Sequence, residues 1–312
     1  MPTNGTLSAP NTSARSWAKN LKPRLSRHSA ARSSNLLSSA IYILMLSMYQ
    51  KHWNLKKLPF ENTPDTEFFF ESESHEEAYS RLSYVVEEKK ACAVLTGAYG
   101  TGKTLILKNL ERQFRKKGYV FSFVQNPRLD DLGLLKIILH NLTGYNVPAR
   151  KEDVLMGIER FLQDTLHDGK HVVVAIDEAQ LINDENVFEE LRLLLNFQTE
   201  KRFLLTLLLS GQPELKEKLD SNKQFSQRIT LSYHLKPLDF EGTRKYVEHR
   251  LEVAGLGENI FNDRAMELIY ERSGGIPRWI NNLANMSMLA AFAKGERAIT
   301  EELVSEGVES SR

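Results

Sequence analysis

The stretch that decides the fold of this 312-residue chain is Gly97-Ala98-Tyr99-Gly100-Thr101-Gly102-Lys103-Thr104. It fits the pattern G-x-x-x-x-G-K-[ST] between an apolar run, 91–96, that we expect to be a strand and a segment, 103–117, that we expect to be a helix. Its glycines let backbone N–H groups turn inward around phosphates, and the helix N-terminus adds partial positive charge. The motif predicts a phosphate-binding loop (P-loop) in which Lys103 reaches the β- and γ-phosphates of ATP and Thr104 places its hydroxyl on Mg²⁺.

Two carboxylates follow the continuous apolar run 171–176, which is typical of a central parallel strand covered on both faces. Asp177 and Glu178 come directly after it, at the edge of the sheet where ligands of open α/β sheets bind. We expect Asp177 to hold the Mg²⁺ shell with Thr104, and Glu178 to orient the attacking water. Phosphoryl transfer needs positioned charge and a positioned water rather than a covalent nucleophile, so Lys103 and Glu178 predict hydrolysis of ATP.

Three more side chains are candidates for the same site. Gln212 follows the apolar run 203–209, and we expect it between the two carboxylates and the γ-phosphate. Arg228 precedes the last expected strand and is interpreted as an arginine finger that completes a neighbour's site, with a surface cation as the alternative. Arg278 follows Pro277 at an expected helix start, so it is predicted to swing over the phosphates; the alternative is again a surface cation.

The order of elements predicts the fold class. Strands alternate with helices up to Pro237, which indicates βαβ units and a parallel sheet. Four helical segments follow, near 239–254, 262–273, 277–293 and 300–308. We therefore expect an α/β nucleotide-binding domain over residues 48–236 and an all-helical lid domain over residues 237–312.

The helix before the P-loop has an expected start of its own. Ser74 and Glu77 form a capping-box pattern, and Ala78, Leu82, Val85 and Val86 recur on one helical face. His75, in the first turn, is interpreted as a surface residue rather than a ligand.

Charge and composition separate the N-terminal residues from the rest. Residues 1–47 contain basic side chains and no acidic one, so all 40 acidic residues lie in residues 48–312, against 41 basic residues in the whole chain. The serine- and arginine-rich composition predicts a disordered extension outside the working protein, with an organelle transit peptide as the alternative. The slightly acidic remainder argues against a general polyanion binder.

Two classes of protein are disfavoured by simple counts. The run 36–49 is too short and too interrupted by serine to span a bilayer, so no transmembrane span is expected. The single cysteine, Cys92, excludes a disulfide framework within the chain, and it is interpreted as a small buried hydrophobe.

From Met48 to about Val308 the order of motifs resembles the AAA+ ATPases of the type II secretion A-component family. Transposon target-selection ATPases, which bind DNA, are similar, and origin-recognition ATPases are similar more distantly. The motifs that carry the resemblance are 49–55, 59–60, 63–65, 74–78, the P-loop, 177–180, 211–215, 227–229 and 275–281.

The resemblance implies a parallel sheet of strand order 5-1-4-3-2, a helical lid, and ATP with Mg²⁺ bound between them. It also implies activity as a ring or filament of copies, with Gln212 as sensor 1, Arg228 as the finger and Arg278 as sensor 2. A cytoplasmic location follows, with a peripheral position at the inner membrane as an alternative.

Two departures limit what the resemblance carries over. Full secretion A-components continue into a membrane span and a peptidoglycan-binding periplasmic domain, and this sequence ends at Arg312 without such a segment, so envelope remodelling is not carried over. The P-loop has Ala98 and Tyr99 where an acidic and an aliphatic residue are more usual, which we expect to alter nucleotide affinity or rate without abolishing binding.

Three functions compete at this level. The first is an assembly ATPase that serves a secretion or envelope apparatus. The second is a DNA-binding ATPase that regulates the choice of transposition target, a partner class that the charge balance does not favour. The third is a nucleotide-binding switch with negligible turnover.

Overall fold

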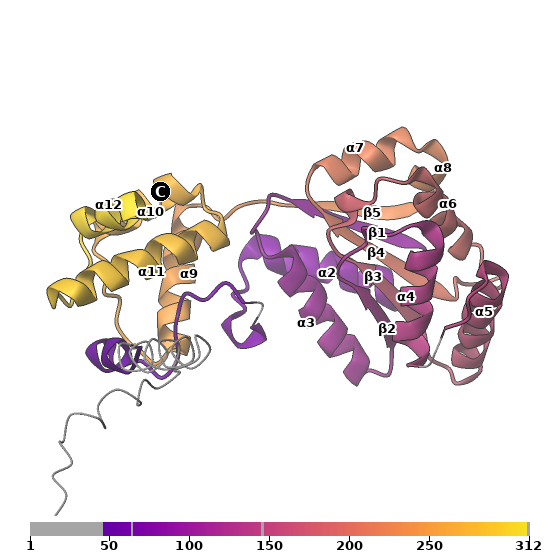
Figure 1. Ribbon diagram of the computed structural model, residues 1–312, viewed down its shortest axis with the longest axis horizontal. Helices are drawn as coiled ribbons and strands as arrows, with labels where there is room; N and C mark the ends of the chain where they lie inside the picture. Colours follow the sequence, from indigo (N-terminus) through magenta and orange to yellow (C-terminus); the bar gives the residue numbers. More distant parts are fainter. Residues whose placement is uncertain (1–45, 64, 145–146, 311–312) are drawn as a thin grey trace, which may run out of the picture. The chain divides into compact units, whose positions relative to one another are not determined.

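The computed structural model describes residues 46–63, 65–144 and 147–310 of the chain (Figure 1). The chain divides into two compact units, residues 1–51 and residues 52–312. In the first unit the described residues, 46–51, are helical. Most of the disordered extension predicted for residues 1–47 lies outside the described residues, and its boundary remains a prediction.

A sheet of five parallel strands forms the centre of the second unit, in the order β2-β3-β4-β1-β5. Counted from its other edge this is the order 5-1-4-3-2, so the predicted fold class is confirmed. The strands are β1 (Cys92–Gly97), β2 (Val120–Val124), β3 (Val172–Ile176), β4 (Leu205–Gly211) and β5 (Ile229–Leu235).

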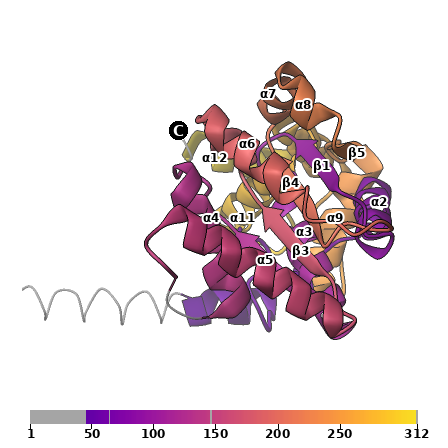
Figure 2. The same cartoon turned by 90° about the vertical axis from the view of Figure 1, so that its right-hand side faces the viewer.

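Helices cover both faces of this sheet, which is why the three inner strands, β3, β4 and β1, are buried at every position. One face packs on α2 (Glu73–Glu87) and α3 (Lys103–Lys116) through a cluster that includes Leu82 and Phe114. The other face is covered mainly by α4, α5 and α6, with the short helices α7 and α8 (Figure 2). The bounds of these are α4 (Asp131–Thr143), α5 (Lys151–His167), α6 (Glu185–Leu194), α7 (Glu214–Ser221) and α8 (Lys223–Ser226).

Two short 3-10 turns accompany these elements, one before α2 and one after β3. They are η2 (Thr66–Phe68) and η3 (Ala179–Leu181). The turn η3 directly follows β3, so it carries the backbone away from the carboxyl end of the sheet. Cys92 in β1 is fully buried, as predicted, and burial raises the pKa of its thiol.

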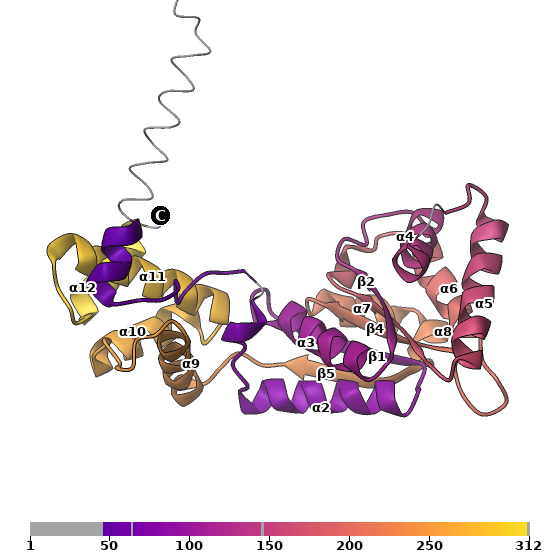
Figure 3. The same cartoon turned by 90° about the horizontal axis from the view of Figure 1, so that it is seen from below.

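Four helices follow β5: α9 (Phe240–Val253), α10 (Asp263–Ser273), α11 (Pro277–Lys294) and α12 (Glu301–Ser310) (Figure 3). Asp239 and Asn262 accept backbone N–H groups at the starts of α9 and α10. Gly274, at φ 58°, caps the C-terminus of α10, and Pro277 is the first residue of α11. Glycine after a helix and proline at a helix start are the residues expected at these positions. The predicted boundary after residue 236 falls between β5 and α9, but both parts belong to the unit 52–312, so the division into two domains remains a prediction. No helix in the described ranges is long and apolar enough to cross a membrane.

A buried histidine at the start of β3 makes stability depend on pH. The Nε2–H of His171 donates to Thr206 Oγ1 at 2.9 Å, because the Thr206 hydroxyl itself donates to the Lys90 carbonyl at 2.7 Å. Burial, with smaller effects from Lys89 and Arg202, lowers the pKa of His171 to about 4. The neutral ring is therefore favoured in the folded state.

We expect this group to destabilise the fold as the pH falls. The unfolded chain takes up the proton near pH 6.5 and the folded chain only near pH 4, so stability present above pH 6.5 is lost between these values. Between about pH 7.5 and about pH 5 the loss from His171 alone is about 2 kcal/mol. Denaturant unfolding at both pH values measures this loss. The fall in the free energy of unfolding between them should be about 2 kcal/mol smaller in His171→Asn than in the parent. An equal pH effect in the two proteins would contradict the assignment.

Candidate nucleotide-binding site

The P-loop connects the end of β1 to the start of α3, and two of its glycines have backbones that other residues rarely adopt. Gly100 has φ 85° and Gly102 has φ 99°, both left-handed. A Cβ at Gly100 would lie 2.7 Å from Cβ of Arg278, and one at Gly102 would lie 2.9 Å from Nε2 of His75. The loop is therefore packed against two side chains from distant parts of the sequence, and glycine makes both approaches possible.

Lys103 lies within this loop rather than on its surface. Its Nζ donates to the carbonyls of Gly97 and Ala98, both at 2.9 Å, and its side chain is buried. Desolvation lowers the pKa of the ammonium, while the carboxylates of Glu178, Asp177 and Glu214 act in the opposite direction. The structure thus places a cation at the centre of the loop with acidic groups near it.

The predicted metal ligands are in direct contact. Thr104 Oγ1 donates to Asp177 Oδ2 at 2.5 Å, and the other carboxylate oxygen accepts the backbone N–H of Glu178 at 3.0 Å. Asp177 is buried. A hydroxyl and a carboxylate are the oxygen donors that Mg²⁺ takes from proteins when phosphates and waters supply the rest. No group of three or more His, Cys, Asp or Glu side chains suited to a metal occurs among the described residues.

Glu178 has an unusual backbone for its residue type. Its φ is 52°, in the left-handed region, and its carboxylate oxygen Oε2 accepts a hydrogen bond from Gln180 Nε2 at 2.5 Å. Glu178 lines a cleft of about 190 Å³ together with Lys103 and Thr104. The two residues predicted for water activation and phosphate binding therefore face the same space.

The opposite wall of this cleft comes from the segment 61–63 and from α9 and α11. Arg250, a buried residue of α9, donates to the Glu61 carbonyl and to the Tyr246 hydroxyl, each at 2.9 Å, and also to the Pro59 carbonyl. A planar guanidinium with its donors so arranged fixes the segment 59–61 against α9. The cleft thus has a rigid second wall.

Arg278 reaches the P-loop through Tyr99. Its backbone N–H donates to the Gly100 carbonyl at 3.3 Å, and its guanidinium lies 4.3 Å from the centroid of the Tyr99 ring. Its Nη1 also donates to the Tyr99 hydroxyl. Tyr99, one of the two unusual P-loop residues, therefore holds the predicted sensor 2 arginine at the loop.

Two candidates lie outside the set of residues that line the cleft. Gln212 directly follows β4, and its backbone N–H donates to Gln180 Oε1 at 3.1 Å. Arg228 lies between α8 and β5, and its Nη2 donates to Asn196 Oδ1 at 3.0 Å. The site roles of both remain predictions.

His75 was wrongly predicted to be a surface residue. It is 5% exposed, and its Nε2–H donates to the Thr101 carbonyl of the P-loop at 3.0 Å. Its Nδ1 then accepts from the Ser72 hydroxyl, at 2.6 Å. The N-cap of α2 is Ser72 rather than Ser74, so the predicted capping box is also wrong.

The sequence contained a signal for this role. His75 precedes Ala78 and Leu82 at the spacing of one helical face, and both of those residues are buried. With Ser72 taken as the cap, the histidine lies on the buried face and can reach the P-loop.

We expect His75→Leu to weaken nucleotide binding about tenfold, because a buried carbonyl of the P-loop loses its donor at a cost of about 1–3 kcal/mol. Titration with a fluorescent adenine nucleotide measures this. Glu76→Gln, exposed on the same turn, is the control and should bind like the parent. Equal affinity in the His75 variant would show that the P-loop keeps its shape without this bond.

The fold and this site together define the class. A P-loop lysine after β1, a Thr–Asp pair and a glutamate after β3 occur in a β2-β3-β4-β1-β5 sheet followed by helices, which is the arrangement of AAA+ proteins. Residues 86–219 match the family described as AAA domain.

A curated relative narrows the class. Over 258 residues the chain is 36% identical to general secretion pathway protein A of Aeromonas hydrophila, an alignment that covers 81% of this chain and 46% of the relative. The chain belongs to the AAA+ family that includes this protein, as the resemblance predicted, and it spans about half of that relative's length. An uncharacterized HTH-type transcriptional regulator of Methanocaldococcus jannaschii is 23% identical over 299 residues, covering 82% of this chain and 73% of the regulator.

Solved structures share the fold. Cdc6p from Pyrobaculum aerophilum superposes with a TM-score of 0.62 at 16% identity, over 84% of this chain and 70% of that one. The ORC1 protein of Aeropyrum pernix in complex with DNA gives a TM-score of 0.58 at 18% identity, over 76% and 64%. The ORC2 protein of the same organism, in ADPNP-ADP complexes, gives 0.57 at 19% identity, over 75% and 66%. At these identities the likeness concerns the fold alone.

Proposed function

We propose that this chain is an ATPase that binds Mg-ATP in the cleft beside the P-loop and hydrolyses it. The observation that carries the proposal is that Lys103, Thr104 and Glu178 line one cleft, with Asp177 hydrogen-bonded to Thr104. These residues follow β1 and β3 of the same sheet, and together they supply a fixed cation, metal ligands and a base for water.

Each residue has a proposed role in that reaction. Lys103 neutralises charge on the phosphates, and the backbone N–H groups of the loop bind their oxygens. Thr104 and Asp177 would hold Mg²⁺, whose chemistry is to neutralise charge that develops on the phosphate oxygens. Glu178 orients and polarises the attacking water.

The remaining candidates are proposed to contact the phosphates or to complete the site of an adjacent copy. Arg278, already against the P-loop, binds phosphate from the helical side. Gln212 lies after β4, next to the strand that carries Glu178, and is proposed to sense the γ-phosphate. Arg228 is proposed to act in the site of an adjacent copy, in a ring or filament, which is the role that the family resemblance implies for it.

We further propose that hydrolysis drives assembly of a secretion or envelope apparatus. The support is the 36% identity to general secretion pathway protein A over most of this chain. DNA binding is the second candidate, and what favours it is the match to an HTH-type transcriptional regulator over 82% of the chain.

Steady-state ATP hydrolysis by the full chain, with and without duplex DNA, tests these proposals. We expect Mg²⁺-dependent hydrolysis that DNA changes by less than about twofold. A large stimulation, with DNA binding that weakens steeply as salt rises, would favour the DNA-binding function. Nucleotide binding without turnover would contradict the ATPase proposal and leave a nucleotide-dependent switch.

A further inference from the structure

The side chain of Gln180, in the turn η3, is bonded at both ends. Its Nε2 donates to Glu178 Oε2 at 2.5 Å, and its Oε1 accepts the backbone N–H of Gln212 at 3.1 Å. A backbone N–H can only donate, so the oxygen end of the amide must face Gln212 and the NH₂ end must face the carboxylate. The orientation of the amide is thus fixed by chemistry, and a flipped amide would lose both bonds.

Gly211, the last residue of β4, makes room for this amide. A Cβ at Gly211 would lie 2.6 Å from Gln180 Oε1, which is closer than real Cβ contacts come. The φ of Gly211 is not in the left-handed region, so backbone conformation does not require a glycine there. Space for Gln180 is a reason for glycine at this position.

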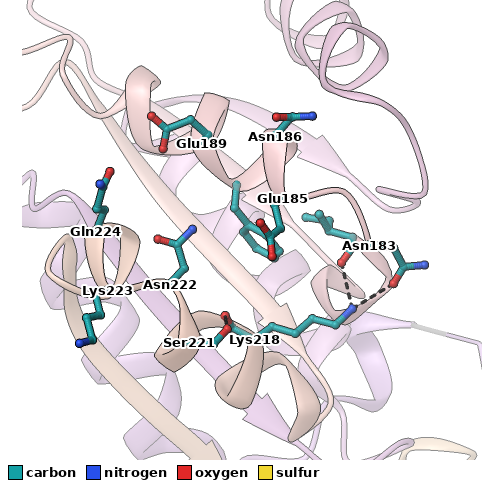
Figure 4. Close-up of a pocket in the computed structure, with 11 residues that line it drawn as sticks. Asn183, Glu185, Asn186, Glu189, Lys218, Ser221, Asn222, Lys223 and Gln224 are labelled. Carbon is teal, nitrogen blue, oxygen red and sulfur yellow. Dashed lines mark hydrogen bonds between the residues drawn. The ribbon is translucent and has the colours of Figure 1, made fainter.

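The backbone of the same turn is held from the other side by Lys218 of α7. Its Nζ donates to the carbonyls of Gln180 at 2.6 Å and Ile182 at 2.9 Å, and to Asn183 Oδ1 at 3.0 Å. Three acceptors match the three N–H bonds of an ammonium group. Lys218 borders a polar cavity of about 760 Å³, where Figure 4 shows its side chain pointing toward Asn183.

We propose that Gln180 is a positioning residue for Glu178, and that it couples the end of β4 to the reaction; this rests on the proposed function. Left-handed backbone at a residue other than glycine costs about 1–3 kcal/mol and persists only where its surroundings hold it. The hydrogen bonds of Gln180 to Glu178 and of Lys218 to the backbone of η3 stabilise this conformation of Glu178. Gln180 occupies one oxygen of the Glu178 carboxylate, Oε2, and leaves the other, Glu178 Oε1, available to the attacking water that the proposed function assigns to this residue.

The coupling follows from the second bond of the amide. The acceptor end of Gln180 is attached to the backbone of Gln212, the residue proposed to sense the γ-phosphate. A shift of Gln212 therefore moves the amide and, through it, the carboxylate of Glu178. Hydrolysis becomes sensitive to what lies against the end of β4 without any direct contact between Gln212 and Glu178.

Gln180→Glu tests this with a change of nearly equal shape. The variant keeps an acceptor for the Gln212 N–H but replaces the donor to Glu178 with a second carboxylate. We expect kcat to fall about tenfold to a hundredfold, since misplacing a reacting group has effects of that order. The Kd for ATP should change less than about threefold, because Gln180 does not line the cleft. Gln224→Glu, exposed on α8, makes the same charge change and should leave both quantities unaltered.

Gln180→Asn supplies a second variant without added charge. The shorter side chain cannot span both partners, so we expect the same fall in kcat with ATP affinity kept. Loss of ATP binding in both variants, or a normal kcat in both, would overturn the proposal.

A double variant separates this inference from the proposed function. If Gln180 acts through Glu178, Glu178→Gln combined with Gln180→Glu should hydrolyse ATP at the rate of Glu178→Gln alone. A further fall in the double variant would show that Gln180 acts independently and would refute the positioning role. Normal hydrolysis by Glu178→Gln itself would instead refute the proposed role of Glu178, whatever the Gln180 variants do.

Discussion

Glu178→Gln should lower the rate of ATP hydrolysis by about two to three orders of magnitude while ATP still binds. The amide has nearly the shape of the carboxylate, so the cleft keeps its form, but it has no charge with which to polarise a water. In the part of the chain that the structure describes, this carboxylate accepts the hydrogen bond that Gln180 Nε2 donates, and the side-chain oxygen of a glutamine can still accept it. Single-turnover hydrolysis and nucleotide titration on the same preparation separate rate from affinity.

Glu185→Gln is the matched control for this change. Glu185 is exposed in the first turn of α6, a few residues after Glu178, and borders the polar cavity rather than the nucleotide cleft. It should hydrolyse ATP like the parent protein. Equal rates for Glu178→Gln and the parent would remove the catalytic role of Glu178 and favour the nucleotide switch.

The parts of the site that the sequence predicted are those encoded by short local patterns. Lys103 and Thr104 are placed by a strand, a glycine loop and a helix that are contiguous in the chain, and the structure has all three. Asp177 follows an apolar run whose carboxyl end must lie at the same sheet edge, and its contact with Thr104 agrees with that. The strand order, by contrast, came from the resemblance to a family and not from the spacing of residues.

The parts that the sequence did not predict depend on contacts between distant segments. The bond from Gln180 to Gln212 exists because β3 and β4 pair in the register that sets Ile176 opposite Leu209. No spacing in the sequence fixes that register. Tyr99 seemed only a departure from the usual P-loop, and its stacking with Arg278 depends on residues 179 positions apart.

His75 was missed for a different reason. The capping-box pattern predicted a helix start at Ser74, which made His75 the first residue of the helix. The structure begins α2 after Ser72, which turns His75 toward Thr101. The helical spacing of His75 with Ala78 and Leu82 indicates its burial, but its bond to the Thr101 carbonyl joins residues 26 positions apart, which no local spacing predicts.

Lys103→Met should raise the Kd for ATP by about a hundredfold or more, because the phosphates lose a buried cation worth about 3 kcal/mol or more. Methionine has a similar length and no charge. Burial lowers the pKa of Lys103, so the folded state disfavours its charged form, but the replacement also removes the donor to the Gly97 and Ala98 carbonyls. These two effects on the stability of the nucleotide-free protein oppose each other, so the Tm of the variant without nucleotide is measured as its own baseline.

Thermal unfolding distinguishes loss of binding from loss of fold in this variant. In the parent, ATP at about a hundred times its Kd stabilises the folded state by about 2.7 kcal/mol and raises Tm. In Lys103→Met, at the same ATP concentration, that stabilisation should fall to about 0.4 kcal/mol or less above the variant's own nucleotide-free baseline. Lys116→Met, exposed in the last turn of the same helix, should retain the full rise. An ATP-dependent rise in Lys103→Met equal to that of the parent would mean that nucleotide binds elsewhere, since a site centred on this ammonium cannot lose it and keep its affinity.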